Sequence, residues 1–148
     1  MTTTTATHRG HKLTTIFDRH NVSIPPDLAA DIDVPVLTGP QRQGDVGIFP
    51  RPPAGAAELT SMSPIPAEGV RVVRGEATGN AHILHADGPA VLWSASSGGL
   101  RLGVLHVPAG STAWLIHTDE HGANGIGAGT FVLTGKREQA DEIRRVAD

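Results

Sequence analysis

Residues 100–117 read LRLGVLHVPAGSTAWLIH, which is two apolar segments of strand length on either side of a Pro-Ala-Gly turn. Apolar residues alternate in both segments, as expected when every second side chain of a strand points to the same face. The alternating positions are Leu100, Leu102, Val104 and His106 in the first segment, and Ala113, Leu115 and His117 in the second. Proline and glycine favour a tight turn between the segments, so the stretch predicts two strands separated by a turn.

Other short β segments lie on both sides of this pair. They span residues 45–49, 70–74, 81–85, 89–94 and 130–134. Residues 50–69 are rich in Pro, Ala and Ser, and they predict a long loop. Short strands separated by turns every ~8–12 residues are typical of an antiparallel barrel or sandwich. We therefore expect a single small all-β domain.

The two ends of the chain differ from this β region. Residues 1–43 begin with a Thr-rich tail and predict an extended N-terminal arm. The arm contains one apolar stripe that a short helical turn would place on one face, formed by Leu13, Ile16 and Phe17. Residues 44–138 form the predicted barrel or sandwich domain, and residues 139–148 predict a short C-terminal helix or tail.

The composition narrows the classes of function. The chain has 148 residues, enough for one domain with its own core, and a formal net charge of -3. Because it has no basic stripe, it is not expected to bind nucleic acid. No apolar run approaches the ~20 residues of a membrane span, and no cysteine is present for disulfides or thiolate ligands. We expect a cytoplasmic protein without membrane contact.

Histidines and acidic residues supply the strongest indication of a site. Five of the eight histidines fall within residues 75–121. The candidate metal ligands are His82, His117, Glu120 and His121. Imidazole and carboxylate donors of this kind bind zinc, iron or manganese, and three ligands with an open position suit hydrolytic or oxygen chemistry. The alternative is that these are ordinary loop histidines and that the HTDEH segment is a polar turn closing a strand.

The remaining candidates have weaker support. Glu76 follows Gly75 at the end of a predicted strand, where it could act as a general base beside the histidines, pair with Arg74 or cap a turn. His85 precedes an Asp-Gly turn, so we expect it to be solvated, whereas His106 on an apolar strand face is expected to be a hydrogen-bonded core or rim histidine. The histidines of the arm, expected to be solvated, are His8, His11 and His20.

Part of this region resembles the cupin family. Residues 79–82 (GNAH), followed by Gly103 and the Pro-Ala-Gly of residues 108–110, are similar to the two cupin motifs. The resemblance implies a double-stranded β-helix of the jelly-roll type and a metal held by histidines and a glutamate. Asn80 stands where the first cupin motif has a histidine, and His117 is the histidine nearest the expected place in the second.

A closer resemblance, covering residues 43–148, is to a family of small bacterial β-proteins with QGDV, GE-x-TGHAH and H-x-EHG motifs. The matching segments are residues 43–46, 75–82, 117–122, 129–131, 136–138 and 144–148. This chain has Asn80 in place of a histidine and Lys136 in place of a glutamine. The resemblance implies a shared site around His82 and His117, and it implies no particular activity.

Two functions of different classes follow from these observations. The first is a small β-domain whose His/Glu cluster binds a divalent metal ion or a small polar ligand. The second is a non-enzymatic structural subunit, a homo-oligomer or part of a larger assembly, that uses the N-terminal arm for subunit contacts. Neither settles whether the protein is an enzyme.

Overall fold

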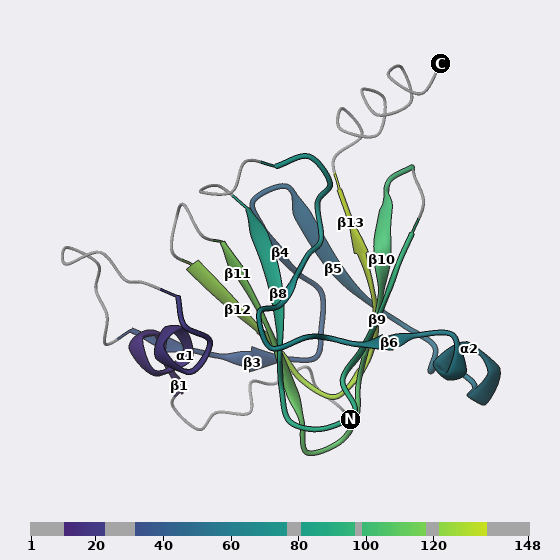
Figure 1. Cartoon of the computed structure of the whole chain (residues 1–148), viewed down its shortest axis with the longest axis horizontal. Helices are drawn as coiled ribbons and strands as arrows, with labels where there is room; N and C mark the ends of the chain where they lie inside the picture. The colour runs from purple at the N-terminus through teal and green to yellow at the C-terminus, as the bar shows by residue number, and fades with distance from the viewer. Residues whose placement is uncertain (1–10, 23–31, 77–80, 97–98, 118–121, 136–148) are drawn as a thin grey trace.

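The structure, a computed structural model, describes residues 11–22, 32–76, 81–96, 99–117 and 122–135 (Figure 1). Within these residues two β-sheets, one of six strands and one of five, enclose the main core. The all-β fold predicted from the spacing of strands and turns is confirmed. Of the two architectures considered, the chain adopts the sandwich, since the strands that enclose the core form two separate sheets. Residues 139–148, with the predicted C-terminal helix or tail, lie outside the described part.

The six-stranded sheet is antiparallel throughout its described strands. In spatial order its strands are β4 (Gln41–Gln43), β5 (Val46–Arg51), β13 (Gly129–Thr134), β10 (Arg101–Val107), β9 (Leu92–Ala95) and β6 (Ser63–Pro64). Strands β5, β10 and β13 in its centre supply most of this sheet's contribution to the core.

The five-stranded sheet contains β8 and β11, which carry the candidate histidines. In order its strands are β3 (Val36–Leu37), β12 (Gly122–Ile126), β11 (Thr112–His117), β8 (His82–Asp87) and β7 (Val70–Arg71). All described neighbours pair antiparallel except β3 and β12, which run parallel. The remaining elements are the strand pair β1 (His11–Lys12) and β2 (Asp33–Val34) and the helices α1 (Leu13–Arg19) and α2 (Ala56–Thr60).

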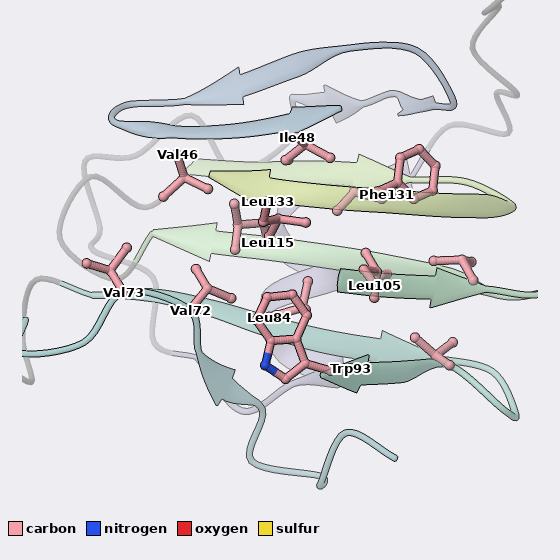
Figure 2. Close-up of a cluster of buried hydrophobic side chains, with 14 residues drawn as sticks. Val46, Ile48, Val72, Val73, Leu84, Trp93, Leu105, Leu115, Phe131 and Leu133 are labelled. Atoms are coloured by element: carbon pink, nitrogen blue, oxygen red, sulfur yellow. The ribbon is translucent and has the colours of Figure 1, made fainter. Parts of the chain in front are cut away.

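The main core fills the space between the two sheets. Figure 2 shows Ile48 and Leu133 of one sheet gathered with Leu84 and Leu115 of the other, and all four are fully buried. Aliphatic side chains supply most of this core, as the low aromatic content of the sequence requires. The burial of this apolar surface is the main force that holds the sheets together.

Strand β11 has the predicted orientation, but β10 differs from it. Ala113 and Leu115 face the core, as their alternation predicts. In β10 the residues fully buried in the core are Leu105 and Val107, which belong to the opposite face from the one predicted. The cause is an irregularity in the pairing with β13 between Arg101 and Gly103, because one extra residue reverses which side chains face inward beyond it.

Helix α1 covers the outer face of the five-stranded sheet. In Figure 1 it lies beside β3, β11 and β12, on the side away from the six-stranded sheet. The predicted helical stripe is confirmed, since all three of its apolar side chains are buried. They form a second apolar cluster with the sheet, made of Leu13, Ile16, Phe17, Val34, Val36, Trp114 and Ile116. The described part of the N-terminal region is therefore packed onto its own domain.

The prediction that residues 50–69 form a long loop throughout is wrong. Residues Ala56–Thr60 form α2, and Ser63–Pro64 pair with β9 as β6. Two consecutive alanines followed by Glu58 favour a helical turn, since alanine has the highest helix propensity. Arg51 holds the helix to β5 through two hydrogen bonds to the Glu58 carboxylate, at 2.6 and 2.8 Å.

Among the described residues no helix is long and apolar enough to cross a membrane.

Candidate functional site

The candidate site lies at one end of the sandwich, next to a row of side-chain amides that links the sheets. This amide seam consists of Gln41, Gln43 and Asn124. Gln43 Nε2 donates to the Leu115 carbonyl at 2.7 Å and to Asn124 Oδ1 at 3.0 Å. Asn124 Nδ2 donates in turn to Gln41 Oε1 at 3.0 Å. The seam therefore fixes β4, and the Gly44 that follows it, against β11 and β12.

His82 and His117 meet on the inner face of the five-stranded sheet. They are directly opposite each other in the antiparallel register of β8 and β11. They share the face of Leu84 and Leu115, which line the core. The ring centres are 4.4 Å apart with an angle of 69° between the ring planes. Their exposed fractions are 5% and 7%, so both imidazoles are almost fully removed from water.

Glu76 holds His82 with both of its carboxylate oxygens. Oε1 accepts the backbone N–H of His82 at 2.9 Å, and Oε2 lies 2.8 Å from His82 Nδ1. Since a carboxylate only accepts hydrogen bonds, the proton of a neutral His82 ring lies on Nδ1, and Nε2 then presents a lone pair. Glu76 therefore contacts His82, and Arg71 donates to the Glu76 backbone oxygen at 2.8 Å.

The second nitrogen of His82 is buried and has no hydrogen-bond partner in the described structure. Gly44 faces it: a Cβ at Gly44 would lie 3.6 Å from His82 Nε2. Gly44 has a φ of +55°, a conformation that glycine adopts without strain. Gln43 Oε1, beside it in the sequence, is also buried without a partner among the described residues. Gln43 and Gly44 were not predicted as site residues, although they belong to the QGDV motif.

The other predicted ligands are not brought to this position by the described structure. Glu120 and His121 lie outside the described residues. No group of three or more histidine, aspartate or glutamate side chains within the described ranges is arranged to hold a metal ion. His106 lies on the other sheet, half-buried, and its Nδ1 is buried without a hydrogen-bond partner, contrary to the predicted hydrogen-bonded state.

A family model matches residues 42–136, which is most of the chain, and its description is Domain of unknown function (DUF8820). The chain belongs to this family. Neither the curated proteins nor the solved structures contain a match. The DUF8820 segment includes Gly44, Glu76, His82 and His117, so the whole inner pair and its surroundings belong to the family domain.

A second pair of histidines lies on the opposite face of the same two strands. His85 of β8 contacts His20, the residue that ends α1, with ring centres 4.6 Å apart and a tilt of 35°. The prediction that His85 is solvated is wrong, because its exposed fraction is 3%. His20 is half-buried, although it was also expected to be solvated. Helix α1 covers both rings, and it precedes the first residue of the DUF8820 match.

The outer pair differs from the inner pair in its hydrogen bonds. His20 Nε2 and His85 Nδ1 are both buried without a partner in the described ranges. Burial lowers the pKa of His85 to about 4, and the neighbouring His20 adds to this effect. Burial also lowers the pKa of His20, against the opposing effect of Asp87. Both rings are therefore neutral at physiological pH.

Proposed function

We propose that the inner histidine pair (His82 and His117) binds a divalent transition-metal ion. The observation that carries this proposal is His82 Nε2, a buried nitrogen without a partner whose ring is held in place by Glu76. A carboxylate on the far nitrogen of a histidine is the usual outer contact of a metal ligand, because it fixes the tautomer and makes the other nitrogen more basic.

The position of the second ring supports an ion between the two histidines. Two imidazoles bound to one tetrahedral ion have their ring centres roughly 5 Å apart, given metal–nitrogen bonds of ~2.0–2.1 Å. The observed separation of the His82 and His117 centres is 4.4 Å, so only a small opening of the pair is needed. Imidazole donors suit zinc, iron or another ion of this series.

We propose Glu120 and His121 as the remaining ligands, because they follow His117 closely in the chain. Together with two imidazoles they would give the mixed nitrogen and oxygen set that zinc, iron and manganese accept. If the metal retained an open position, it could polarise a substrate or activate a bound water. Whether such a centre catalyses a reaction depends on a substrate, so metal binding is the function proposed.

The same site could instead hold a small polar ligand. The lone pair of His82 Nε2 and the carbonyl oxygen of Gln43 are both acceptors, and both are buried without partners in the part of the chain described. A ligand with two N–H donors, such as a primary amine or an amide, would satisfy both. This alternative uses the same residues and differs from the metal site in the chemistry of the occupant.

The motif resemblances fit this proposal. Residues 75–82 supply both Glu76 and His82, and we propose that this segment is the ligand-binding motif of the family. Asn80 stands where the motifs of the cupins and of the bacterial proteins that this chain resembles would have a histidine. A chain with a histidine at residue 80 would offer one more donor, so we expect this chain to bind its ion less tightly than such a relative.

Metal titration of the untagged, chelator-treated protein tests the proposal. We expect about one equivalent of Zn²⁺ or Co²⁺ to bind, with Co²⁺ giving the strong visible absorption of a tetrahedral site. His82→Ala and His117→Ala should each abolish this absorption. Glu76→Gln should weaken binding by about 10- to 100-fold, because it removes the outer carboxylate.

His106→Ala is the matched control, since His106 is a half-buried histidine on the other sheet. It should bind metal as the unmodified chain does. Equal binding by the control and by both inner-pair variants would exclude the proposed site. If no variant binds metal but amines raise the melting temperature only when His82 is present, the polar-ligand alternative replaces the metal.

The alternative function as an assembly subunit has less support. Its proposed contact element is the N-terminal arm, and the described part of that arm packs onto its own sheet through Ile16 and Phe17. Light scattering of the full chain and of a version beginning at Gln43 tests this function. A homo-oligomer that dissociates on removal of the arm would establish it.

A further inference from the structure

Helix α1 is attached to the domain through an apolar cluster that is separate from the main core. Its apolar residues Ile16 and Phe17 pack against Trp114 and Ile116 on the outer face of the sheet. This outer cluster is separate from the core between the sheets. The helix also lies before the segment matched by the family domain. Loss of α1 would therefore leave the core between the sheets in place.

The C-terminal end of α1 lies directly over a histidine of the sheet. The rings of His20 and His85 are in contact, and each has a buried nitrogen without a hydrogen-bond partner in the described structure. The other side of His85 is closed as well, because a Cβ at Gly69 would lie 2.9 Å from His85 Cε1. Gly69 has a φ of +84°, so this close contact depends on glycine.

Asp87, the carboxylate nearest the pair, is already engaged. Asp87 Oδ2 accepts from the guanidinium of Arg19 and from Trp114 Nε1, the latter at 3.2 Å. His11 packs edge-on against Trp114, with ring centres 5.0 Å apart. A proton added to either ring of the pair would thus be held next to a second imidazole, with the nearby carboxylate shared by other donors.

The ionisable side chains on the neighbouring elements do not change this arrangement. The other ionisable side chains on these elements are Asp18 and Arg19 on α1, His11 and Lys12 on β1, Asp33 on β2, Arg71 on β7 and Asp87 on β8. Asp33 is paired with Lys12 at 3.0 Å, which leaves Asp87 as the anion that acts on His20, and Arg19 opposes it.

We propose that α1 is an acid-sensitive cover: protonation of the outer histidine pair (His20 and His85) releases α1 from the five-stranded sheet and exposes the apolar face around Trp114. Release gives both rings access to water, where each can hold a proton without facing the other. The domain between the sheets stays folded, because its core does not include the residues of α1.

The direction of the pH effect follows from His85. Its pKa is lowered from 6.5 to about 4 while α1 covers it, so the open form takes up protons first as the pH falls. The cover is fully stable above about pH 6.5 and loses stability down to about pH 4. Between about pH 7 and about pH 5 the open fraction is expected to rise about 20-fold from His85 alone. Protonation of His20 adds to this rise.

Hydrogen exchange measures this opening directly. After correction for the intrinsic rates, the protection of α1 amides should fall about 20-fold between about pH 7 and about pH 5. Amides of β10 and β13 belong to the sheet without α1 and exchange through global unfolding, so they should stay much more strongly protected than α1 amides at both pH values. Equal protection in both places at about pH 5 would mean global acid unfolding, and unchanged protection of α1 would also overturn the proposal.

Two substitutions assign the effect to the outer pair. His85→Gln and His20→Gln each remove one ionisable ring, and each should reduce the fall in α1 protection at acid pH. Either variant suffices if the other fails to fold. His106→Gln is the matched control and should retain the full response. A response that persists in both outer-pair variants would assign the opening to other groups and contradict the proposal.

Discussion

Two pairs of histidines lie on opposite faces of the five-stranded sheet, and the two pairs are built differently. On the inner face Glu76 fixes His82 opposite His117, so one ring nitrogen is satisfied and the other is held ready for a ligand. On the outer face His20 and His85 are pressed together by a helix, with no carboxylate holding either ring nitrogen in the described structure.

The difference shows what a buried histidine can do in each setting. A ring that a carboxylate orients is prepared to donate a lone pair in one direction, which is the requirement of a binding site. A ring buried without such a partner resists protonation, which links the packing of α1 to pH. The inner pair belongs wholly to the DUF8820 segment, whereas half of the outer pair precedes it.

The largest expected effect concerns the outer face. Trp114→Ala should lower the free energy of unfolding by about 3–5 kcal/mol, because a fully buried indole under α1 is replaced by a cavity. Denaturant unfolding followed by circular dichroism measures this. Trp114→Phe, which keeps one aromatic ring but loses the hydrogen bond to Asp87 and part of the indole's volume, should cost less, about 1–2 kcal/mol. Equal costs for the two variants would show that α1 contributes little packing over this residue.

Acidification should distinguish the outer histidine pair from the inner pair by its effect on stability. Because the pKa of His85 is lowered to about 4, the free energy of unfolding should fall as the pH drops from about 6.5 toward 4, by about 3 kcal/mol in total. Urea unfolding at a series of pH values measures the slope. His85→Gln should lose most of the slope, while His106→Gln should keep it. A slope unchanged by His85→Gln would assign the acid sensitivity to other groups.

Removal of the inner carboxylate should have a smaller effect on stability. Glu76→Ala should cost about 1.5–3 kcal/mol, because two hydrogen bonds from His82 to a charged acceptor are lost. Glu76→Gln should recover part of this, since its amide oxygen can still accept one of them. Glu58→Gln, which removes a charge from an ion pair nearer the surface, is the control and should change the melting temperature less. The reverse order would contradict the role given to Glu76.

The smallest stability effect is expected at Gly44, where binding should respond more than folding. Gly44→Ala should cost about 1 kcal/mol, because alanine is strained at a φ of +55°. Its methyl group would also lie beside His82 Nε2 and reduce metal affinity. Gly110→Ala is the matched control, since Gly110 has a φ of +86° and nothing within 4 Å of the added atom. Equal metal affinity in the two variants would remove Gly44 from the site.

The sequence predicted which segments form strands better than it predicted what packs against each face of those strands. The alternation in residues 113–117 correctly predicted the inward face of β11, because the pairing of β11 with its neighbours has no irregularity. The same reasoning failed in β10, where the bulge near Gly103 depends on pairing with β13. Alternation also places His85 on the face opposite His82, but it carries no information on whether a helix covers that face.

The site could be predicted in part for similar reasons. His82 lies at the start of one predicted strand segment and His117 at the end of another, and their meeting across the sheet requires only that these two strands be antiparallel neighbours. The contact of Gly44 with His82 depends on how β4 is placed across the sandwich, which no local pattern encodes. The QGDV motif that begins at Gln43 was the one sequence feature that indicated a role for Gly44. The sequence alone does not show where this motif lies relative to His82.

The amide seam also contains a residue that is prone to chemical change when the protein is stored. Asn124 is followed by Gly125, and asparagine before glycine is the sequence most prone to lose its side-chain amide as the backbone nitrogen attacks it. Here Asn124 Nδ2 donates to Gln41 and to the Arg42 carbonyl. Deamidation would replace that donor with a negative charge facing two acceptors and would loosen β4. A mass spectrum of stored protein would therefore indicate how much of it still has its two sheets joined at this end.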